Sequence, residues 1–277
     1  MASDGGRRCS AGRCIGGRCI DAVKLTAAML TVLATVTVTV VTVATTVAAD
    51  NTQQLHIGNF SAAQAGGDYP PPWQPLTFKK IPRHTAYQLV EDHGVVVLQA
   101  DSDNAASGLS REVAIDPVEY PIVEWRWKVD NVLAGGDVAR KTGDDYPARL
   151  YITFAYDARR VGLWERAKYR AARLFYGKHP PSAALNYLWA SRAAVGTQVA
   201  NAYTDRVQMF VVRSGAAQAG QWRNESRNVL RDYRAAFGDD SMGPPMISGV
   251  AVMTDTDNTG EFARAWFGDI VFKAADK

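Results

Sequence analysis

The chain has 277 residues, of which 47% are hydrophobic and 21% charged, and its formal net charge is +3. The excess positive charge is confined to the first 49 residues. Removing their five basic and two acidic side chains from the totals of 31 and 28 leaves 26 of each sign. We therefore expect no nucleic-acid partner, because binding to nucleic acid is dominated by neutralisation of phosphates.

Residues 1–49 have the pattern of an N-terminal export signal or membrane anchor. Their basic side chains precede an uncharged run from Leu25 to Ala49, which Asp50 ends. A basic start, an apolar middle and small residues at the end are typical of an export signal, with cleavage expected before Asp50. An uncleaved anchor is the alternative, because about 20 apolar residues span a bilayer. Both interpretations predict a periplasmic or secreted protein.

Residues 50–76 are rich in Ala, Gly and Pro and predict an extended lead-in. Residues 77–277 are expected to form a single β-sandwich domain, since short β-patterned runs recur between turn signals without alternating helices. The pattern favours an all-β, antiparallel β-sandwich. The expected strands are Tyr87–Val90, Gly94–Ala100, Gly108–Ile115, Ile122–Val129, Arg149–Tyr156, Asn186–Ala190, Val207–Arg213, Gly249–Thr254 and Asp269–Lys273.

Two of these strands alternate clearly enough to assign their faces. In the first, IVEWRWKV, Val123, Trp125, Trp127 and Val129 fall on one face and Glu124, Arg126 and Lys128 on the other. In the second, RLYITFAY, Leu150, Ile152, Phe154 and Tyr156 oppose Arg149, Tyr151 and Thr153. Successive side chains of a strand point to opposite faces. We expect the apolar sets to form the core and the polar sets to line an outer face.

Two segments predict helices instead. Leu163–Tyr176, within an insert at about residues 160–178, is amphipathic, with Leu163 and Trp164 on its apolar side and several arginines on the other. We expect the apolar side to pack on the domain. Contact with a membrane surface or a partner is the alternative for such a basic helix. Asn228–Phe237 predicts a shorter helix that ends at Gly238.

The stretch GDDYPARLYI places two adjacent carboxylates, Asp144 and Asp145, ahead of a strand. Three interpretations are open. The aspartates accept hydrogen bonds from backbone amides or pair with Arg149 or Arg126, or they bind a ligand, or they catalyse a reaction. Catalysis on glycans needs carboxyl groups about 5–10 Å apart, so a partner from elsewhere in the chain would be required.

A second acidic stretch, TDTDNTGEF, resembles the beginning of a calcium loop, with Asp255 and Asp257 in the first and third positions. The twelfth position is Trp266, where a calcium-binding helix–loop–helix has a glutamate. An oxygen-lined calcium site that includes Asp255 and Asp257 is one interpretation, and an Asx-rich turn is the other. The sequence predicts no other cofactor: all three cysteines lie in residues 1–49 and the four histidines form no zinc-binding frame.

Seven stretches in order resemble a family of uncharacterised bacterial exported proteins, domain of unknown function 3047. They run from about Thr77 to Phe272 and read AASGLSREV, IVEWRWKV, GDDYPARLYITF, LNYLWAS, NESRNVLRDYRAAFG, VAVMTDTDNTG and FGDI. The resemblance implies a galactose-binding-like jelly-roll sandwich by fold analogy and implies no catalytic residues.

The leading hypothesis is a non-catalytic binding module of the cell envelope that recognises a glycan or another envelope component. In this hypothesis the carboxylates accept hydrogen bonds from ligand hydroxyls, the arginines donate, and a tyrosine ring stacks. The first alternative is an envelope glycan hydrolase or lyase that uses aspartates of the GDDY and DTDN loops. The second is a membrane- or partner-bound scaffold that uses residues 163–176. The predicted ligand-binding residues are Glu124, Arg126, Asp144, Asp145, Arg149 and Tyr151.

Overall fold

The computed structural model describes residues 53–176, 180–239 and 241–275. The expected export or anchor segment lies outside the described residues. Asp50–Lys277 form one compact unit. Among the described helices, none combines the length and the apolar character that a membrane crossing requires.

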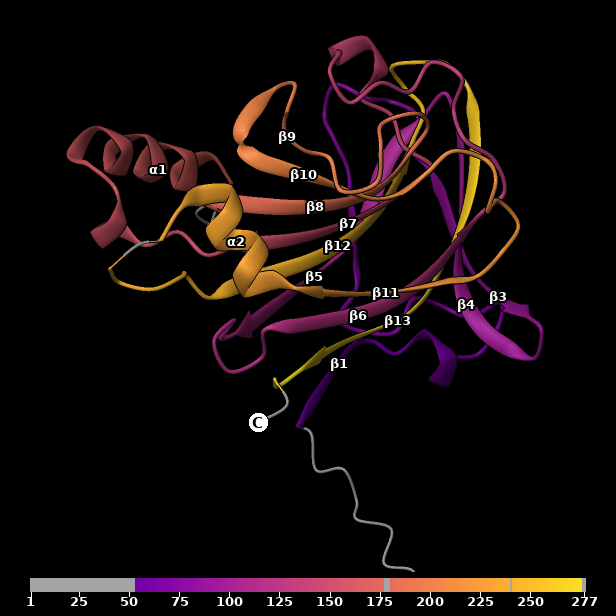
Figure 1. The fold of residues 1–277 in the computed structure, drawn as a ribbon, viewed down its shortest axis with the longest axis horizontal. Helices are drawn as coiled ribbons and strands as arrows, with labels where there is room; N and C mark the ends of the chain where they lie inside the picture. Colours follow the sequence, from indigo (N-terminus) through magenta and orange to yellow (C-terminus); the bar gives the residue numbers. More distant parts are fainter. Residues whose placement is uncertain (1–52, 177–179, 240, 276–277) are drawn as a thin grey trace, which may run out of the picture. The chain divides into compact units, whose positions relative to one another are not determined.

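In the described part of the chain, two sheets stack face to face (Figure 1). The first sheet has six strands, all paired antiparallel, and the last strand of the chain, β13, lies in its centre. Its strands in spatial order are β11 (Arg223–Asn228), β6 (Ile122–Val129), β13 (Phe262–Lys273), β4 (Val95–Asp103) and β3 (Ala86–Asp92), and β1 (Gln54–Gly58) also pairs with β13.

The second sheet has seven strands and contains one parallel pair, β8 with β10. The parallel pairing arises because β9 forms a hairpin with β10 on the far edge, so the chain crosses back before it enters β10. The strands in spatial order are β2 (Gln74–Leu76), β5 (Ala106–Ile115), β12 (Ile247–Asp255), β7 (Ala148–Phe154), β8 (Ala183–Ala190), β10 (Thr204–Ser214) and β9 (Gln198–Asn201).

Aromatic side chains join the two sheets. Trp125 of β6 stacks on Tyr187 of β8, with ring centroids 5.4 Å apart, and Trp127 lies 6.2 Å from Trp189 of the same strand. All four rings are buried in one hydrophobic cluster with aliphatic side chains of both sheets. The inward face predicted for IVEWRWKV is therefore confirmed. Large buried rings contribute much of the stabilising apolar area of such a core.

The prediction of a β-sandwich of the jelly-roll type with one basic amphipathic helix and a second short helix is confirmed. Each expected strand is present, although boundaries shift and β13 begins at Phe262, well before the predicted Asp269. Four further strands, β1, β2, β9 and β11, were not predicted. They are short or strongly polar, as in RNESRN of β11, and they pair mainly at sheet edges, where apolar alternation is not required.

The second helix, α2 (Val229–Phe237), begins and ends where its sequence indicates. The side chain of Asn228 accepts a hydrogen bond from the backbone N–H of Arg231, which caps the first turn. Gly238 follows the last turn with φ of 87°, a backbone conformation that favours glycine.

The beginning of the first helix, α1 (Leu163–Tyr176), does not pack as predicted. Among its residues 163–170, whose side chains the structure describes, Tyr169 is the buried one, and its ring stacks on Tyr156, with centroids 4.0 Å apart. Leu163 and Trp164, expected to pack on the domain, are exposed. Tyr156 is also placed differently from the prediction, because β7 ends at Phe154 and the two following residues leave the core.

Replacing one ring of the core tests the stacking of the two sheets. Trp127→Ala is expected to lower the free energy of unfolding by about 3–5 kcal/mol, because it empties a fully buried site. Trp164→Ala is the matched control and should change it by less than about 0.5 kcal/mol, since that ring is exposed. Denaturant titration measures both values, and equal losses would contradict this account of the core.

Candidate functional site

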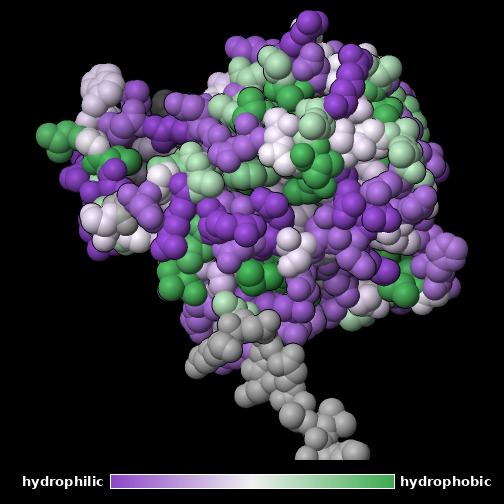
Figure 2. Space-filling view, viewed as in Figure 1, coloured by the Kyte–Doolittle hydropathy of each residue, from purple (hydrophilic) through white to green (hydrophobic). Residues whose placement is uncertain are grey.

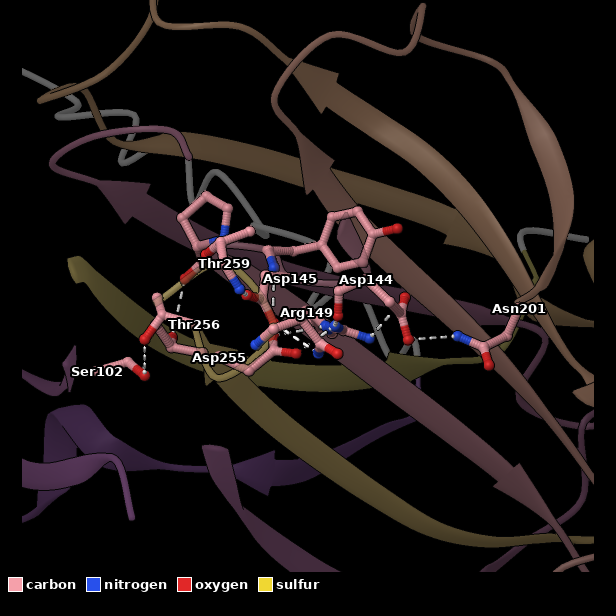
Figure 3. Close-up of polar contacts among 12 residues, drawn as sticks. Ser102, Asp144, Asp145, Arg149, Asn201, Asp255, Thr256 and Thr259 are labelled. Atoms are coloured by element: carbon pink, nitrogen blue, oxygen red, sulfur yellow. Dashed lines mark hydrogen bonds and ion pairs between the residues drawn. The ribbon is translucent and has the colours of Figure 1, made fainter. Parts of the chain in front are cut away.

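Arg149 is the buried centre of the candidate site (Figure 3). It lies on the outer face of the seven-stranded sheet, opposite to the core residues Leu150 and Ile152, yet it is only 2% exposed. The segment before β7 folds back over it. The guanidinium carbon lies 4.2 Å from the centre of the Tyr146 ring, and one of its terminal nitrogens donates to the backbone carbonyl of Asp144.

Asp255, the last residue of β12, is the main partner of Arg149. Nε of Arg149 donates to Oδ1 of Asp255 at 2.8 Å, and Nη2 donates to Oδ2. Burial alone would lower the pKa of Arg149, but attraction by Asp255 and Asp144 raises this pKa well above its usual value. Arg149 therefore stays charged and holds the end of β12 against β7.

Asp145 ties the GDDY loop to the turn that follows β12. Its Oδ1 accepts from the backbone N–H and the side-chain amide of Asn258, at 3.3 and 3.0 Å, and its Oδ2 accepts from the backbone N–H of Thr259 at 2.6 Å. Asp145 is 0% exposed. Of the three interpretations of this loop, acceptance from backbone amides describes its geometry.

Asp144 connects the same loop to the edge of the sheet. Its Oδ2 accepts from the side-chain amide of Asn201 in β9 at 2.9 Å, and its Oδ1 lies 3.6 Å from Nη1 of Arg149. A short 3-10 turn, η2 (Lys141–Gly143), precedes the two aspartates, and its glycine lies against Asp137 where a Cβ would clash with the backbone. The side chains of Asp144 and Asp145 then point to different partners, Asn201 and the turn after β12.

The carboxylates of Asp145, Asp255 and Asp257 converge, because each can place one oxygen within 4.8 Å of the others. Oxygen ligands are the kind that calcium prefers. However, both oxygens of Asp255 already accept from Arg149, so an ion here would share Asp255 with the guanidinium. Calcium binding by Asp255 and Asp257 stays a prediction. Burial, and then the charge of Asp145, raise the pKa of Asp257.

The same geometry bears on catalysis. The aspartates of the GDDY and DTDN loops do meet, as the hydrolase or lyase hypothesis requires. Yet Asp145 and Asp255 are buried and their oxygens accept hydrogen bonds from protein donors. A substrate would have to displace Arg149 and the turn around Asn258 to reach them, so this cluster is better suited to fixing loops than to turnover.

Glu124 and Arg126 lie far from this cluster in the architecture. They are on β6, on the outer face of the six-stranded sheet, whereas Arg149 and Tyr151 are on the outer face of the other sheet. The inner faces of the two sheets face each other, so their outer faces point away from each other. A single site that combines all six predicted residues is therefore incompatible with the structure.

The predicted residues on the two sheets contact different neighbours. Glu124 pairs with Lys273 at 2.6 Å, and the guanidinium of Arg126 lies 4.5 Å from the centre of the Trp222 ring. Both line a hollow of about 430 Å³. Tyr151 accepts a hydrogen bond from Nη1 of Arg149 at 3.0 Å and lies next to it along β7.

A groove of about 510 Å³ crosses the outer face of the seven-stranded sheet, beyond Tyr151 along β7. Small side chains of β5 and β12 form its floor, and Tyr156 lies at its end beside Pro181. The sequence reasoning did not identify this groove. The residues that line it are Leu76, Ser110, Arg111, Glu112, Val113, Thr153, Ala155, Tyr156, Pro181, Ser248, Gly249, Val250 and Ala251.

The signal for the groove is present in two strands. Ser110 of β5 and Gly249 and Ala251 of β12 are outward-pointing positions that line the groove, and all three are small, while Glu112 opposes Gly249 across the strand pair. A sheet face of small residues lies lower than its surroundings, which leaves room for a ligand. These small residues predict a groove only if β5 and β12 are known to be neighbours. Residues close together in the sequence do not indicate that pairing, because the two strands are far apart in the chain.

The chain resembles one protein family and several solved structures. The profile of a family described as "Protein of unknown function (DUF3047)" matches residues 71–271. No curated protein sequence matches the chain.

Solved structures with a similar architecture include the family 11 carbohydrate-binding module of the cellulosomal cellulase Lic26A-Cel5E of Clostridium thermocellum. It is 10% identical, with a TM-score of 0.39, over 80% of this chain and 95% of that one. The cleaved K3 adhesin domain of Lys-gingipain from Porphyromonas gingivalis w83 is 9% identical, with a TM-score of 0.36 over 79% and 100% of the two chains. Endoglucanase 3 of Trichoderma harzianum, from family GH12, is 8% identical, with a TM-score of 0.33 over 82% and 99%. Likenesses this weak carry no inference about function.

Replacing Arg149 tests whether its ion pair with Asp255 stabilises the fold. Arg149→Met is expected to lower the free energy of unfolding by about 3–5 kcal/mol, because it leaves Asp255 buried without its partner. The double variant Arg149→Met/Asp255→Leu should recover most of the loss. The control Arg83→Met breaks an exposed pair with Asp103 and should cost less than about 1 kcal/mol. Thermal and urea unfolding measure these differences, and an Arg149→Met loss no larger than the control would refute the assignment.

Asp257 gives a pH-dependent and calcium-dependent test. Its pKa is raised in the folded state, so its ionisation at neutral pH opposes folding, and this penalty disappears below the usual carboxyl pKa. In EDTA, Asp257→Asn is expected to raise the free energy of unfolding at pH 7 and to change it little near pH 3. Without EDTA, calcium should raise the melting temperature of the wild type and not of Asp257→Asn. No calcium shift in the wild type would contradict the calcium prediction.

Proposed function

The chain belongs to the DUF3047 family of proteins of unknown function, and we propose that it is a non-catalytic binding module of the cell envelope. Its ligand in this proposal is a glycan or another envelope component, held in the groove on the outer face of the seven-stranded sheet. The protein would act outside the cytoplasm, as the export pattern of residues 1–49 indicates.

The groove itself is the observation that carries the proposal. Its volume of about 510 Å³ is in the range of small-ligand sites, about 300–1,000 Å³. It is open along a sheet face, and Gly249 and Ala251 keep its floor low. An open groove with a shallow floor suits a segment of a long polymer, which enters from the side, better than a small molecule that needs enclosure.

The lining of the groove has the chemistry that a sugar ring requires. Hydroxyl groups of Ser110, Thr153 and Ser248 line it, and hydroxyls both donate and accept hydrogen bonds. The ring of Tyr156 at the end of the groove is held by stacking on Tyr169. Aromatic rings have an apolar face against which the C–H face of a sugar can pack. Together these groups favour a hydroxyl-rich ligand with apolar patches.

The acidic cluster supports a binding role over a catalytic one. Arg149 and Asp255 fix the end of the same outer face, and Tyr151 lies between them and the groove by the alternation of β7. Because the oxygens of Asp145 and Asp255 accept from protein donors, the cluster would hold the groove rigid instead of attacking a bond. The hydrolase or lyase alternative predicts release of reducing sugars or unsaturated products from envelope glycans, and we expect none.

Filling the groove tests the proposal. Ser110→Phe places a large ring on the groove floor and is expected to weaken binding to envelope glycan at least tenfold. The matched control is Ser226→Phe, which adds the same ring to the hollow on the other sheet, beside Glu124 and Arg126. Sedimentation with purified cell-wall glycan and calorimetry with soluble envelope polysaccharide measure binding, and thermal unfolding checks that both variants fold.

The binding results of the two variants and of the wild type distinguish the groove from the hollow on the six-stranded sheet. Loss in Ser110→Phe alone supports the groove. Loss in Ser226→Phe alone would move the binding site to the six-stranded sheet and refute the groove. Absence of binding by the wild type to every envelope fraction would end the binding-module proposal.

A further inference from the structure

The beginning of α1 carries an exposed apolar pair. Leu163 is 83% exposed and Trp164 is 74% exposed. They are adjacent, and among residues 163–170 of this helix Tyr169 is the buried side chain. Exposed side chains of this size are unfavourable in water and often mark an interaction surface when they gather with others.

Two methionines lie at the same end of the sandwich. The loop before β12 is held beside the beginning of α1, because Arg160 donates to the backbone carbonyls of Gly243 and Met242, at 2.5 and 3.1 Å. Met242 and Met246 are 45% and 43% exposed and line a hollow of about 550 Å³ with Arg159 and Arg160. Four of the eight large hydrophobic side chains that are exposed in the described residues are thus Leu163, Trp164, Met242 and Met246.

Basic side chains surround this apolar surface. Between residues 157 and 170 the chain carries five basic and two acidic side chains. The two acidic ones are paired: Asp157 binds Arg159 at 2.8 Å, and Glu165 binds Lys168 at 3.0 Å and Arg206 at 2.5 Å. Figure 2 shows hydrophobic and hydrophilic side chains next to each other on α1. We call this surface, formed by residues 157–170 with Met242 and Met246, the α1 end.

We propose that the α1 end docks on an anionic lipid bilayer. Trp and Leu insert at the level of the headgroups, where an indole ring has both an apolar and a hydrogen-bonding environment, and the flanking cations are attracted to anionic headgroups. The net positive charge around the apolar side chains of the α1 end favours a bilayer over a protein as the binding partner. A bilayer offers an extended anionic surface and needs no shape complementarity, whereas a protein partner of a surface with long basic side chains would have to bury those charges.

The groove lies next to the α1 end. Ala155 and Tyr156 line both the groove and the hollow that contains Met242 and Met246, and Tyr156 stacks on Tyr169 of α1. A protein docked through the α1 end therefore holds the groove close to the bilayer surface. The docking itself does not depend on what the groove binds.

Tryptophan fluorescence can locate the contact. Among the seven tryptophans, Trp164 is exposed, whereas Trp73, Trp125, Trp127 and Trp189 are buried and Trp222 and Trp266 are half-buried. Vesicles of phosphatidylglycerol with brominated phosphatidylcholine are expected to quench the emission of the full-length wild type. Trp164→Phe should abolish this quenching while it leaves vesicle flotation unchanged, because Phe keeps the apolar ring.

Charge variants separate attraction to the bilayer from a general effect of charge. Arg159→Gln/Arg170→Gln is expected to weaken the vesicle affinity on the order of tenfold or more, since each basic residue near an anionic surface contributes about 1 kcal/mol. Arg83→Gln/Arg140→Gln removes the same charge elsewhere on the surface and should leave the affinity nearly unchanged. Brominated phosphatidylcholine vesicles without the anionic lipid should quench much less.

The proposal is overturned if anionic brominated vesicles do not quench the wild type, or if they quench Trp164→Phe equally. Flotation without quenching that depends on Trp164 would assign the contact to another segment, such as residues 1–49, and would also overturn it. A protein partner captured by the α1 end in the absence of any lipid effect counts against it too. The groove variants Ser110→Phe and Ser226→Phe serve here as controls that should dock normally.

Discussion

The ion pair between Arg149 and Asp255 is the interaction on which the outer surface of the seven-stranded sheet depends. A buried guanidinium is costly unless its hydrogen-bond donors have partners. Asp255, the carbonyl of Asp144 and the hydroxyl of Tyr151 supply them. The loop before β7, the end of β12 and the edge strand β9 are consequently held in one arrangement, and the groove begins where this rigid region ends.

Much of the fold follows from local sequence, because the two-residue alternation of a strand is a local property. The buried faces of β6 and β7 are examples: Trp125, Trp127, Leu150 and Ile152 are all in the core. The cap and the end of α2 are equally local. Alternation also placed Arg149 correctly on an outer face, but it could not indicate that a loop covers that face, since burial depends on residues that are distant in the chain.

The candidate site could be predicted only in part, for a related reason. Alternation states that Glu124 and Arg149 point outward but not which sheet each strand joins, and the two outer faces of a sandwich point apart. Sheet membership is decided by pairings such as β6 with β13, far apart in sequence. The groove needs the pairing of β5 with β12. Only the meeting of the two acidic loops was accessible as a hypothesis, because both follow or precede recognisable strands.

The central place of β13 in the six-stranded sheet has a consequence for biosynthesis. This strand follows all the others along the chain, β1 pairs with it, and β6 and β4 each pair with it along one of their two edges. None of these three strands can complete its hydrogen-bond ladder until residues 262–273 have left the ribosome. The six-stranded sheet can therefore close only after Phe262–Lys273 has emerged, whereas β3 can pair with β4 once both have been synthesised, well before β13.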